Sequence, residues 1–506
     1  MKKNNLSNAA LIMFIMLLLS KILGLLRDVL LAYRFGTSYI NDAYTIAITV
    51  PSILFAIFVS GFSESYIPFF ARLKTDREKN AFFSNIISTL VIISFLAAIF
   101  CSLNSDFIVK MLAPGFHGKT AALTGSYISI IVWAFPFYAA FSILSAQLQI
   151  QEKFSTANFC NFIVVNIMLI LSILASSVTR NLILVIGYVI AEMASFIILL
   201  IYFIKTADTS YRPEMREMAV QFIGLAKLAI PVGLSFMMNQ LNSITDQFFS
   251  SMLGDGTTSS LSYANKIQSL FLTLTTAVFM KVCFPRITFN FAKLNKKDGL
   301  YYVEKGYLMG MFLTVPFSLL IVFFSKPIVL ILFERGAFNS EATNIISGCL
   351  KFYAIGIPFY AFSEVQSRTL TAAIKQKYIL KNTIVVVVFN IILDYILMQF
   401  MGINGLALAT SLSGVLMFLL MAKDLQKLKL TVSGNELFKE EARIVLAAIL
   451  SGVVSYGGYL AAEKFVGISI SFFISVVIFG SMYTLSSVVF NIGIFKWMLM
   501  RLSNKS

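Results

Sequence analysis

The stretch LILVIGYVIAEMASFIILLIYF, which runs from Leu182 to Phe203, decides the fold class of this chain. A helix rises about 1.5 Å per residue, so an apolar block of this length crosses a hydrocarbon layer of ~30 Å. Similar blocks recur along the whole chain. In lipid, only helices and closed barrels satisfy every backbone hydrogen-bonding group. Because the blocks are about twice as long as a barrel strand, the sequence predicts membrane-spanning helices.

The composition fits the same class. Of the 506 residues, 58% are hydrophobic and only 13% are charged, which excludes a soluble enzyme. The 40 Lys and Arg residues exceed the 24 Asp and Glu residues and give a formal net charge of +16. No long stretch is polar enough to form a nucleic-acid-binding domain, so we expect no nucleic-acid partner. The four cysteines have no CxxC spacing and are expected to be small buried residues.

The blocks predict an all-α polytopic membrane protein with about fourteen transmembrane helices. The expected spans are 9–32, 43–62, 82–103, 127–148, 158–176, 182–203, 220–241, 261–284, 307–324, 345–370, 379–400, 405–422, 444–462 and 468–490. The start of the chain resembles a signal peptide but lacks a small-residue cleavage site, so we interpret it as an uncleaved first helix.

The basic residues predict the orientation, because Lys and Arg are retained on the cytoplasmic side of the membrane. If the N-terminus is inside, cytoplasmic segments hold about 27 of the 40 basic residues and the opposite loops hold about seven. The alternation holds at nearly every loop, and an even number of spans places both termini in the cytoplasm. The charge therefore predicts a multi-pass protein of a cytoplasmic membrane.

An internal repeat divides the chain. Phe135-Pro136-Phe137-Tyr138 matches Ile357-Pro358-Phe359-Tyr360 at an offset of roughly 222 residues, and further matches precede this pair. About six spans separate the copies, so the halves have the same orientation, related by an axis along the membrane normal. We predict two six-helix lobes in parallel pseudo-symmetry, residues 1–205 and 206–425, followed by two C-terminal helices in residues 426–506. This is a transporter architecture.

Six basic residues lie within or at the edges of predicted spans: Lys21, Arg27, Lys266, Lys281, Lys351 and Arg368. The last three lie near span ends, where snorkelling explains them, so Lys21, Arg27 and Lys266 are the candidates for function. Charges at this depth are costly and usually face a water-filled cavity or a partner. Ser20 and Asp28 accompany the first two on the same span. A structural salt bridge from Asp28 to Lys21 or Arg27 is one explanation. The alternative is a cationic cavity, whose excess of Lys and Arg would suit an anion such as a phosphate.

Oxygen-bearing side chains form a second group. Asn390 and Asp394 are one helical turn apart on the eleventh span, Thr410 lies on the next span, and Asp246 lies at the end of the seventh. Two carboxylates with neutral oxygen ligands suit a small hard cation, and no His or Cys favours a transition metal. A purely structural hydrogen-bonded cluster is the alternative. No other cofactor is expected.

The chain resembles the MurJ/MviN family of lipid II flippases, within the multidrug/oligosaccharidyl-lipid/polysaccharide exporter superfamily. The resemblance covers nearly the whole chain. The segments that carry it are 20–28 (SKILGLLRD), 41–44 (NDAY) with the following Pro51, 263–266 (YANK), 333–338 (FERGAF) and 405–412 (GLALATSL).

The resemblance implies a flippase of the bacterial cytoplasmic membrane that carries an undecaprenyl-diphosphate-linked precursor by alternating access, acts as a monomer and is not an enzyme. It implies that Arg27, Asp28 and Asp42 contribute, with Ser20, Lys21 and Lys266, to a cavity for the diphosphate and sugar head group. It implies a sodium site of Asp246, Asn390, Asp394 and Thr410 with the Leu406 carbonyl, and a groove for the polyprenyl tail in the last two helices. The chain has no Walker motif, so we expect an ion gradient or the membrane potential to drive transport.

The chain also departs from the family pattern. Lys21 and Lys266 stand where the family typically has Arg, and the residues after Pro51 lack the family's cavity Arg and Glu; Glu64 is a partial substitute for the acid. A flippase for another polyprenyl-linked glycan, such as a capsule or exopolysaccharide unit, is therefore the nearest alternative. A cation-coupled drug exporter would need a more acidic or aromatic cavity, and a membrane glycan transferase or polymerase usually has a large outer loop.

Overall fold

The computed structural model describes the whole chain except residues 1–2, 154, 294, 432–434 and 504–506. The described residues form helices joined by turns and loops, without strands, which confirms the all-α prediction. By contacts the chain divides into two compact units. Unit 1 comprises Met1–Ser259 and Arg335–Phe338, and unit 2 comprises Ser260–Glu334 and Asn339–Ser506.

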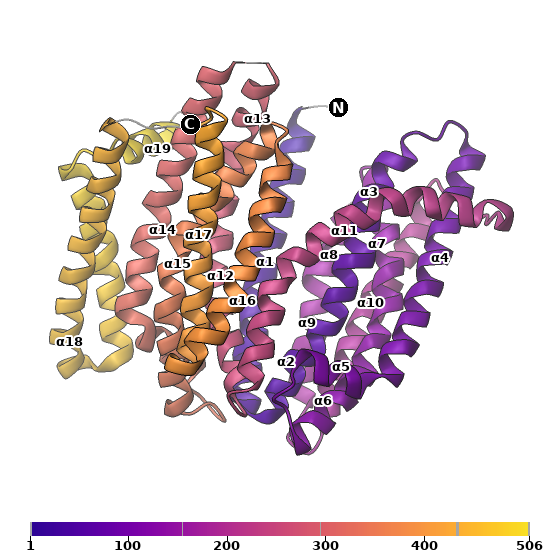
Figure 1. Cartoon of the computed structure of the whole chain (residues 1–506), viewed down its shortest axis with the longest axis horizontal. Coiled ribbons are helices and arrows are strands. Elements are labelled where there is room, and N and C mark those ends of the chain that lie inside the picture. Colours follow the sequence, from indigo (N-terminus) through magenta and orange to yellow (C-terminus); the bar gives the residue numbers. More distant parts are fainter. Residues whose placement is uncertain (1–2, 154, 294, 432–434, 504–506) are drawn as a thin grey trace. The chain divides into compact units, whose positions relative to one another are not determined.

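The main helices of unit 1, in chain order (Figure 1), are α1 (Lys3–Phe35), α2 (Tyr39–Leu54), α3 (Gly61–Phe70), α4 (Asp76–Leu103), α5 (Ser105–Leu112), α6 (Gly118–Ile131), α7 (Phe135–Ile150), α8 (Ser155–Phe159), α9 (Val165–Ala175), α10 (Leu182–Thr206) and α11 (Met215–Ser251). Short segments of other helix types, η1 (Phe55–Ser60), η2 (Val132–Ala134) and η3 (Cys160–Val164), continue or join some of them. The helix α12 (Thr257–Val282) begins in unit 1 and continues in unit 2.

The helices of unit 2 are α13 (Phe284–Ala292), α14 (Lys296–Phe333), α15 (Ser340–Ala372), α16 (Gln376–Met401), α17 (Ile403–Lys427), α18 (Asn435–Val489) and α19 (Gly493–Ser503). Figure 1 shows that α13 and α19 lie at the same end of this unit, and both pack against α14. The helix α15 packs between α14 and α17, while α18 packs on α14.

Eleven helices in the described part of the chain are long and apolar enough to cross a membrane. The helices α1 and α12, which contain the first and eighth predicted spans, are not among the eleven. The last two predicted spans both lie in α18, which is interrupted at Gly467, where φ is +77°. The count of fourteen spans therefore stays a prediction.

Apolar side chains fill the interior of each unit and also cover its outer surface. In unit 1, buried residues such as Phe82, Tyr66 and Leu144 bring α3, α4 and α7 together. In unit 2, residues such as Phe312, Ile444 and Phe479 join α14 to α18. Large apolar side chains are nevertheless exposed along the spans, among them Phe100 on α4. A surface of this kind is stable only in lipid.

The predicted lobe boundaries stay predictions. The boundary at 205/206 falls at the end of α10, but contacts group α11 with unit 1, because α11 packs on α3, η1 and α4. The boundary at 425/426 falls in the last turn of α17.

Candidate functional site

The basic face of α1 contains an ion pair. Both Nε and Nη2 of Arg27 donate to Oδ1 of Asp28 at 3.3 Å. The Arg27 side chain is 29% exposed and that of Asp28 is 10% exposed. Of the two salt bridges that the sequence left open, this is the one with Arg27. Arg27 also interacts electrostatically with Tyr44 of α2 and Tyr188 of α10, so the pair lies among aromatic hydroxyls within unit 1.

Ser20 and Lys21 lie two turns earlier on the same helix. Nδ2 of Asn166, on α9, donates to Oγ of Ser20 at 3.5 Å, and Gly24 also approaches Asn166. This contact holds α1 against α9. The side chain of Lys21 is exposed. The α1 candidates thus share one helix, but Arg27 is held by Asp28 while Lys21 extends from the surface of the unit.

Asp42 is fully buried, and both of its carboxylate oxygens accept hydrogen bonds from the backbone. Oδ1 accepts from the N–H of Ser259 at 2.7 Å, and Oδ2 accepts from the N–H of Gly256. These N–H groups lie in and just before the first turn of α12, where a helix cannot satisfy them itself. Asp42 therefore anchors the start of α12 onto α2, and its predicted contact with a substrate stays a prediction.

Lys266 belongs to unit 2. Its Nζ lies 5.3 Å from the ring centroid of Tyr263, one turn earlier on α12. Tyr263 is buried, and its ring packs against Phe333 at 4.9 Å. The face of an aromatic ring attracts a nearby Lys ammonium group.

The oxygen-bearing residues predicted to hold a cation lie mostly in unit 2, on the packed pair α16 and α17. Asn390, Asp394 and Leu406 are fully buried, and Thr410 is 6% exposed. The Thr410 carbonyl accepts a hydrogen bond from Tyr360 at 2.8 Å. Asp246 is also buried, but it lies on α11 in unit 1.

The side chain of Asn390 is the part of this cluster that bears most directly on ion binding. Neither Oδ1 nor Nδ2 of Asn390 has a hydrogen-bond partner among the described residues. Burying an amide without partners costs free energy, and a buried carboxylate one turn away raises that cost. A small cation would coordinate Oδ1 and offset the carboxylate charge, so the donor set fits Na⁺. No group of three His, Cys, Asp or Glu side chains able to hold a metal occurs in the described part of the chain.

Glu192 is a candidate that the sequence reasoning missed. It lies in the middle of α10, is 6% exposed, and interacts electrostatically with Tyr138 of α7 and with Tyr188. Because Tyr188 also interacts with Arg27, Glu192 belongs to the same polar interior of unit 1. The signal was present in the sequence, because a single acid inside an apolar span is as unusual as a base.

Unit 2 contains a mainly apolar pocket of about 160 Å³. Residues of α14, α15, α17 and α18 line it, including Tyr307, Phe418 and Leu437, with Gln366 and Glu441 as polar members. The contribution from α18 places this pocket beside the segment predicted to accommodate a lipid tail.

Comparison with known proteins gives a consistent result. The family model described as lipid II flippase MurJ matches residues 31–497. A probable lipid II flippase MurJ of Buchnera aphidicola is 25% identical over 87% of this chain and 88% of its own length, and one of Helicobacter pylori is 27% identical over 78% and 89%.

Solved structures agree. A lipid II flippase MurJ in an inward closed conformation superposes with a TM-score of 0.84 at 27% identity, over 95% of this chain and 98% of that one. An inward-facing multidrug resistance MATE family transporter of the MOP superfamily superposes with a TM-score of 0.67 over 82% and 96% of the two chains. At 12% identity, this second likeness concerns the fold alone.

Proposed function

The chain belongs to the lipid II flippase MurJ family, and we propose that it moves lipid II, an undecaprenyl-diphosphate-linked peptidoglycan precursor, from the inner to the outer leaflet of the bacterial cytoplasmic membrane. The family is one of transporters, so the protein is not an enzyme. The observation that carries the proposal is the Arg27–Asp28 ion pair inside the first helix of a fold that matches a MurJ structure at a TM-score of 0.84.

The diphosphate of the head group is the part of the substrate that Arg27 would bind. A guanidinium offers a planar fork of donors that matches phosphate oxygens, and the partial exposure of Arg27 leaves it accessible. Asp28 would hold the guanidinium in place until the substrate competes for it. Lys21 adds a second positive charge on the same helix, and Ser20 a hydroxyl. Lys266, in unit 2, is a further candidate for this anion.

We propose that the protein works by alternating access and that Na⁺ binding or the membrane potential drives net transport in one direction. The support for Na⁺ is the buried Asn390 amide beside Asp394, with Leu406 and Thr410 on the adjoining helix and Asp246 as the predicted fifth member. One elementary charge that crosses 100 mV gains about 2.3 kcal/mol. Each further charge that crosses in a cycle adds the same amount to the driving force.

The polyprenyl tail would stay in lipid, next to α18. The apolar pocket that Leu437 helps to line is the support for this assignment. A tail of repeating apolar units needs only a continuous apolar surface, so shape matters less there than at the head group.

A flippase for another polyprenyl-linked glycan is the second candidate function. Its support is the segment after Pro51, where η1 is a π-helix of apolar residues and Ser60 in place of the family's Arg and Glu. Glu64, which could replace the acid, is exposed on α3. A head group with a different charge or sugar would follow from this change.

The deciding experiment is complementation. Bacteria depleted of their own lipid II flippase receive this chain, and lipid II on the outer face is measured by cleavage with an external lipid II-degrading enzyme. We expect restored outer-face lipid II and growth. In the second arm, cells that lack a capsule-precursor flippase receive the same chain. Restored capsule export in these cells, without restored lipid II on the outer face in the first arm, would establish the alternative substrate.

A further inference from the structure

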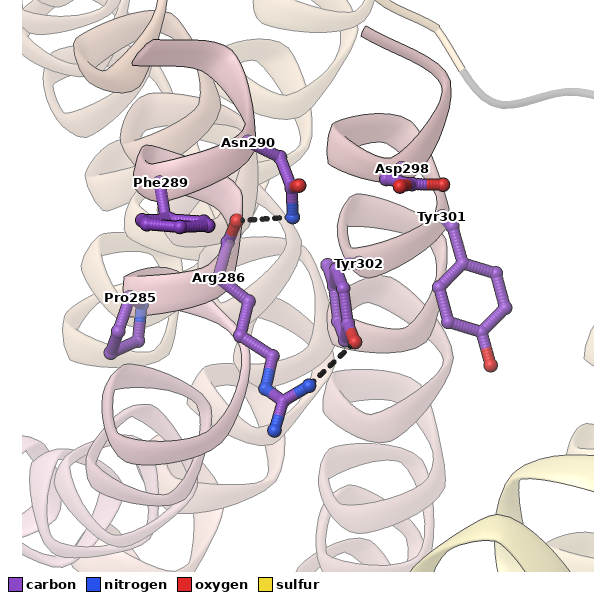
Figure 2. Close-up of a pocket in the computed structure, with 7 residues that line it drawn as sticks. All are labelled: Pro285, Arg286, Phe289, Asn290, Asp298, Tyr301 and Tyr302. Carbon is purple, nitrogen blue, oxygen red and sulfur yellow. Dashed lines mark hydrogen bonds between the residues drawn. The ribbon is translucent and has the colours of Figure 1, made fainter. Parts of the chain in front are cut away.

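The helix α13 and the first turns of α14 form a hairpin with a pocket of about 620 Å³ between them (Figure 2). This volume lies within the ~300–1,000 Å³ range of pockets that hold small ligands. The pocket lies entirely in unit 2 and is separate from the residues proposed above for substrate and sodium.

The helix α13 has two different faces. Ile287 is fully buried and packs, with Phe284 and Phe291, in the core of unit 2. Arg286, Phe289 and Lys293 follow at the spacing of a different helical face and are exposed. The apolar face therefore fixes α13 in position, and the basic, aromatic face is left to meet solvent or lipid.

Arg286 is positioned but carries an uncompensated charge. Its Nη1 donates to the Tyr302 hydroxyl at 2.7 Å, the bond drawn as a dashed line in Figure 2. Its guanidinium lies 5.3 Å from the centroid of the same ring. No ion pair of Arg286 with a carboxylate occurs among the described residues. The other guanidinium N–H groups are thus oriented as a fork by a neutral partner, which is the arrangement that binds a phosphate oxygen pair.

Asp298, the acid that lines the pocket, is hydrogen-bonded to Asn295 at the start of its own helix. Oδ2 of Asp298 accepts from Nδ2 of Asn295 at 2.7 Å, and the N–H of Asp298 donates to Oδ1 of Asn295 at 3.3 Å. Asp298 therefore belongs to the cap of α14. Lys293 lies 4.3 Å from the Phe289 ring centroid, on the side of the pocket that α13 forms.

The position of the hairpin identifies the ligand. Residues 284–305 contain five basic and two acidic residues, and α14 continues directly into a membrane span. By the positive-inside rule this end of the span faces the cytoplasm, where anionic phospholipids give the leaflet a negative surface potential. Exposed Phe289 and Tyr301 are typical of the level at which headgroups lie.

We propose that this pocket binds the phosphodiester headgroup of an anionic phospholipid in the cytoplasmic leaflet. Arg286 contacts the phosphate, the Phe289 and Tyr302 rings form the walls, and the net positive charge of the hairpin selects anionic over zwitterionic lipids. The site holds the cytoplasmic end of α14 at the level of the headgroups.

The test is titration calorimetry on the purified full chain with dihexanoyl phosphatidylglycerol, dihexanoyl phosphatidylcholine and inorganic phosphate. We expect phosphatidylglycerol to bind at least about tenfold more tightly than the other two, with binding weakened by salt. R286Q should lose about tenfold or more in affinity for phosphatidylglycerol. The control K119Q, which removes an exposed charge from unit 1 and leaves the charge of the hairpin unchanged, should change it by less than about twofold.

Two results would overturn the proposal: unchanged phosphatidylglycerol binding by R286Q, or equal binding of phosphatidylcholine. Inorganic phosphate binding as tightly as phosphatidylglycerol would also overturn it, because the site would then recognise a soluble anion. If R286Q does not fold, Y302F is the test variant instead, because it removes only the hydroxyl that orients Arg286. Y302F should weaken binding, and wild-type affinity in Y302F would count against the site.

Discussion

At the scale of single residues, Arg27 illustrates how a charge persists inside a membrane span. Its guanidinium is bonded to the adjacent carboxylate of Asp28 and lies near two tyrosine hydroxyls, so the pair is neutral overall and still partly exposed. The remaining exposure is what a substrate phosphate needs in order to reach Arg27.

Replacing Arg27 separates charge from geometry. We expect R27A to reduce lipid II transport in the complementation assay by at least about tenfold, since it removes the charged donors and leaves Asp28 without this partner. R27K keeps the charge but loses the planar fork, so its activity should be intermediate. K119Q, which removes an exposed charge from the first turn of α6, is the control. Wild-type transport by R27A at equal expression would exclude Arg27 from substrate binding.

A second prediction at the scale of single residues concerns Asp42. D42N keeps one oxygen acceptor but turns an NH₂ group toward a backbone N–H, so one of the two bonds to Gly256 and Ser259 is lost. We expect a loss of about 1–3 kcal/mol of stability, visible as a lower midpoint of thermal unfolding in detergent. D208N, at an acid that is 87% exposed, should leave the midpoint unchanged. Equal midpoints for D42N and the wild type would show that the bonds to α12 contribute nothing.

At the scale of helices, α16 and α17 carry two Asn–Asp sets that differ in how they are satisfied. Nδ2 of Asn382 donates to Oδ2 of Asp424 at 2.8 Å, so this pair joins the two helices directly. Asn390, two turns further along α16, has no such partner among the described residues. The contrast within one helix pair distinguishes a structural amide from one that is available to an ion.

The sodium proposal therefore has an internal control. We expect Na⁺, but not K⁺, to raise the unfolding midpoint of the wild type, because a ligand that binds only the folded state stabilises it. D394N should lower the Na⁺ affinity by about tenfold or more, and N390A should lower it as well. N382A removes a hydrogen bond between the same helices and should keep the Na⁺ response. A full response in D394N would remove the ion site.

The breaks between helices were harder to predict than the helices. Every predicted span coincides with a helical stretch of the structure to within one or two residues at its ends, because apolar blocks of about 20 residues leave the backbone few alternatives in lipid. The π-helices η1 and η3 have no such signal in the sequence, because they depend on tertiary packing within unit 1. Pro51 lies four residues before η1. Its presence indicates that the helix is distorted in this region, but it does not predict a π-helix.

Gly467 makes the interruption of α18 testable. Its φ of +77° and ψ of 168° are accessible to glycine and strained for other residues. We expect G467A to lose about 1–3 kcal/mol of stability, measured as a lower thermal midpoint. G480A, in the same helix with space for a Cβ, should gain or lose no more than about 1 kcal/mol. Equal effects of the two substitutions would show that the interruption is not built on glycine.

At the scale of the molecule, the sequence identified side chains but not their partners. It selected Arg27 and Asp28 because charges are rare in spans, and these two are paired. It could not predict that Asp42 anchors the start of α12, since more than 200 residues separate the bonded groups. It also could not predict that the candidates would divide between two compact units, with Asp246 in one and Asn390, Asp394, Leu406 and Thr410 in the other. Such divisions depend on packing that no local pattern encodes.

The last prediction follows from the net charge of +16 and concerns the orientation of the whole chain. About 27 basic residues lie in segments predicted to be cytoplasmic, so Lys297 should be inside and Lys119 outside. The four native cysteines are buried, which leaves a low background for thiol labelling. In intact cells, a membrane-impermeant maleimide should label K119C but not K297C, and permeabilisation should expose both. Labelling of K297C in intact cells would reverse the orientation and place the pocket beside Arg286 on the outer face, where the proposed cytoplasmic lipid could not reach it.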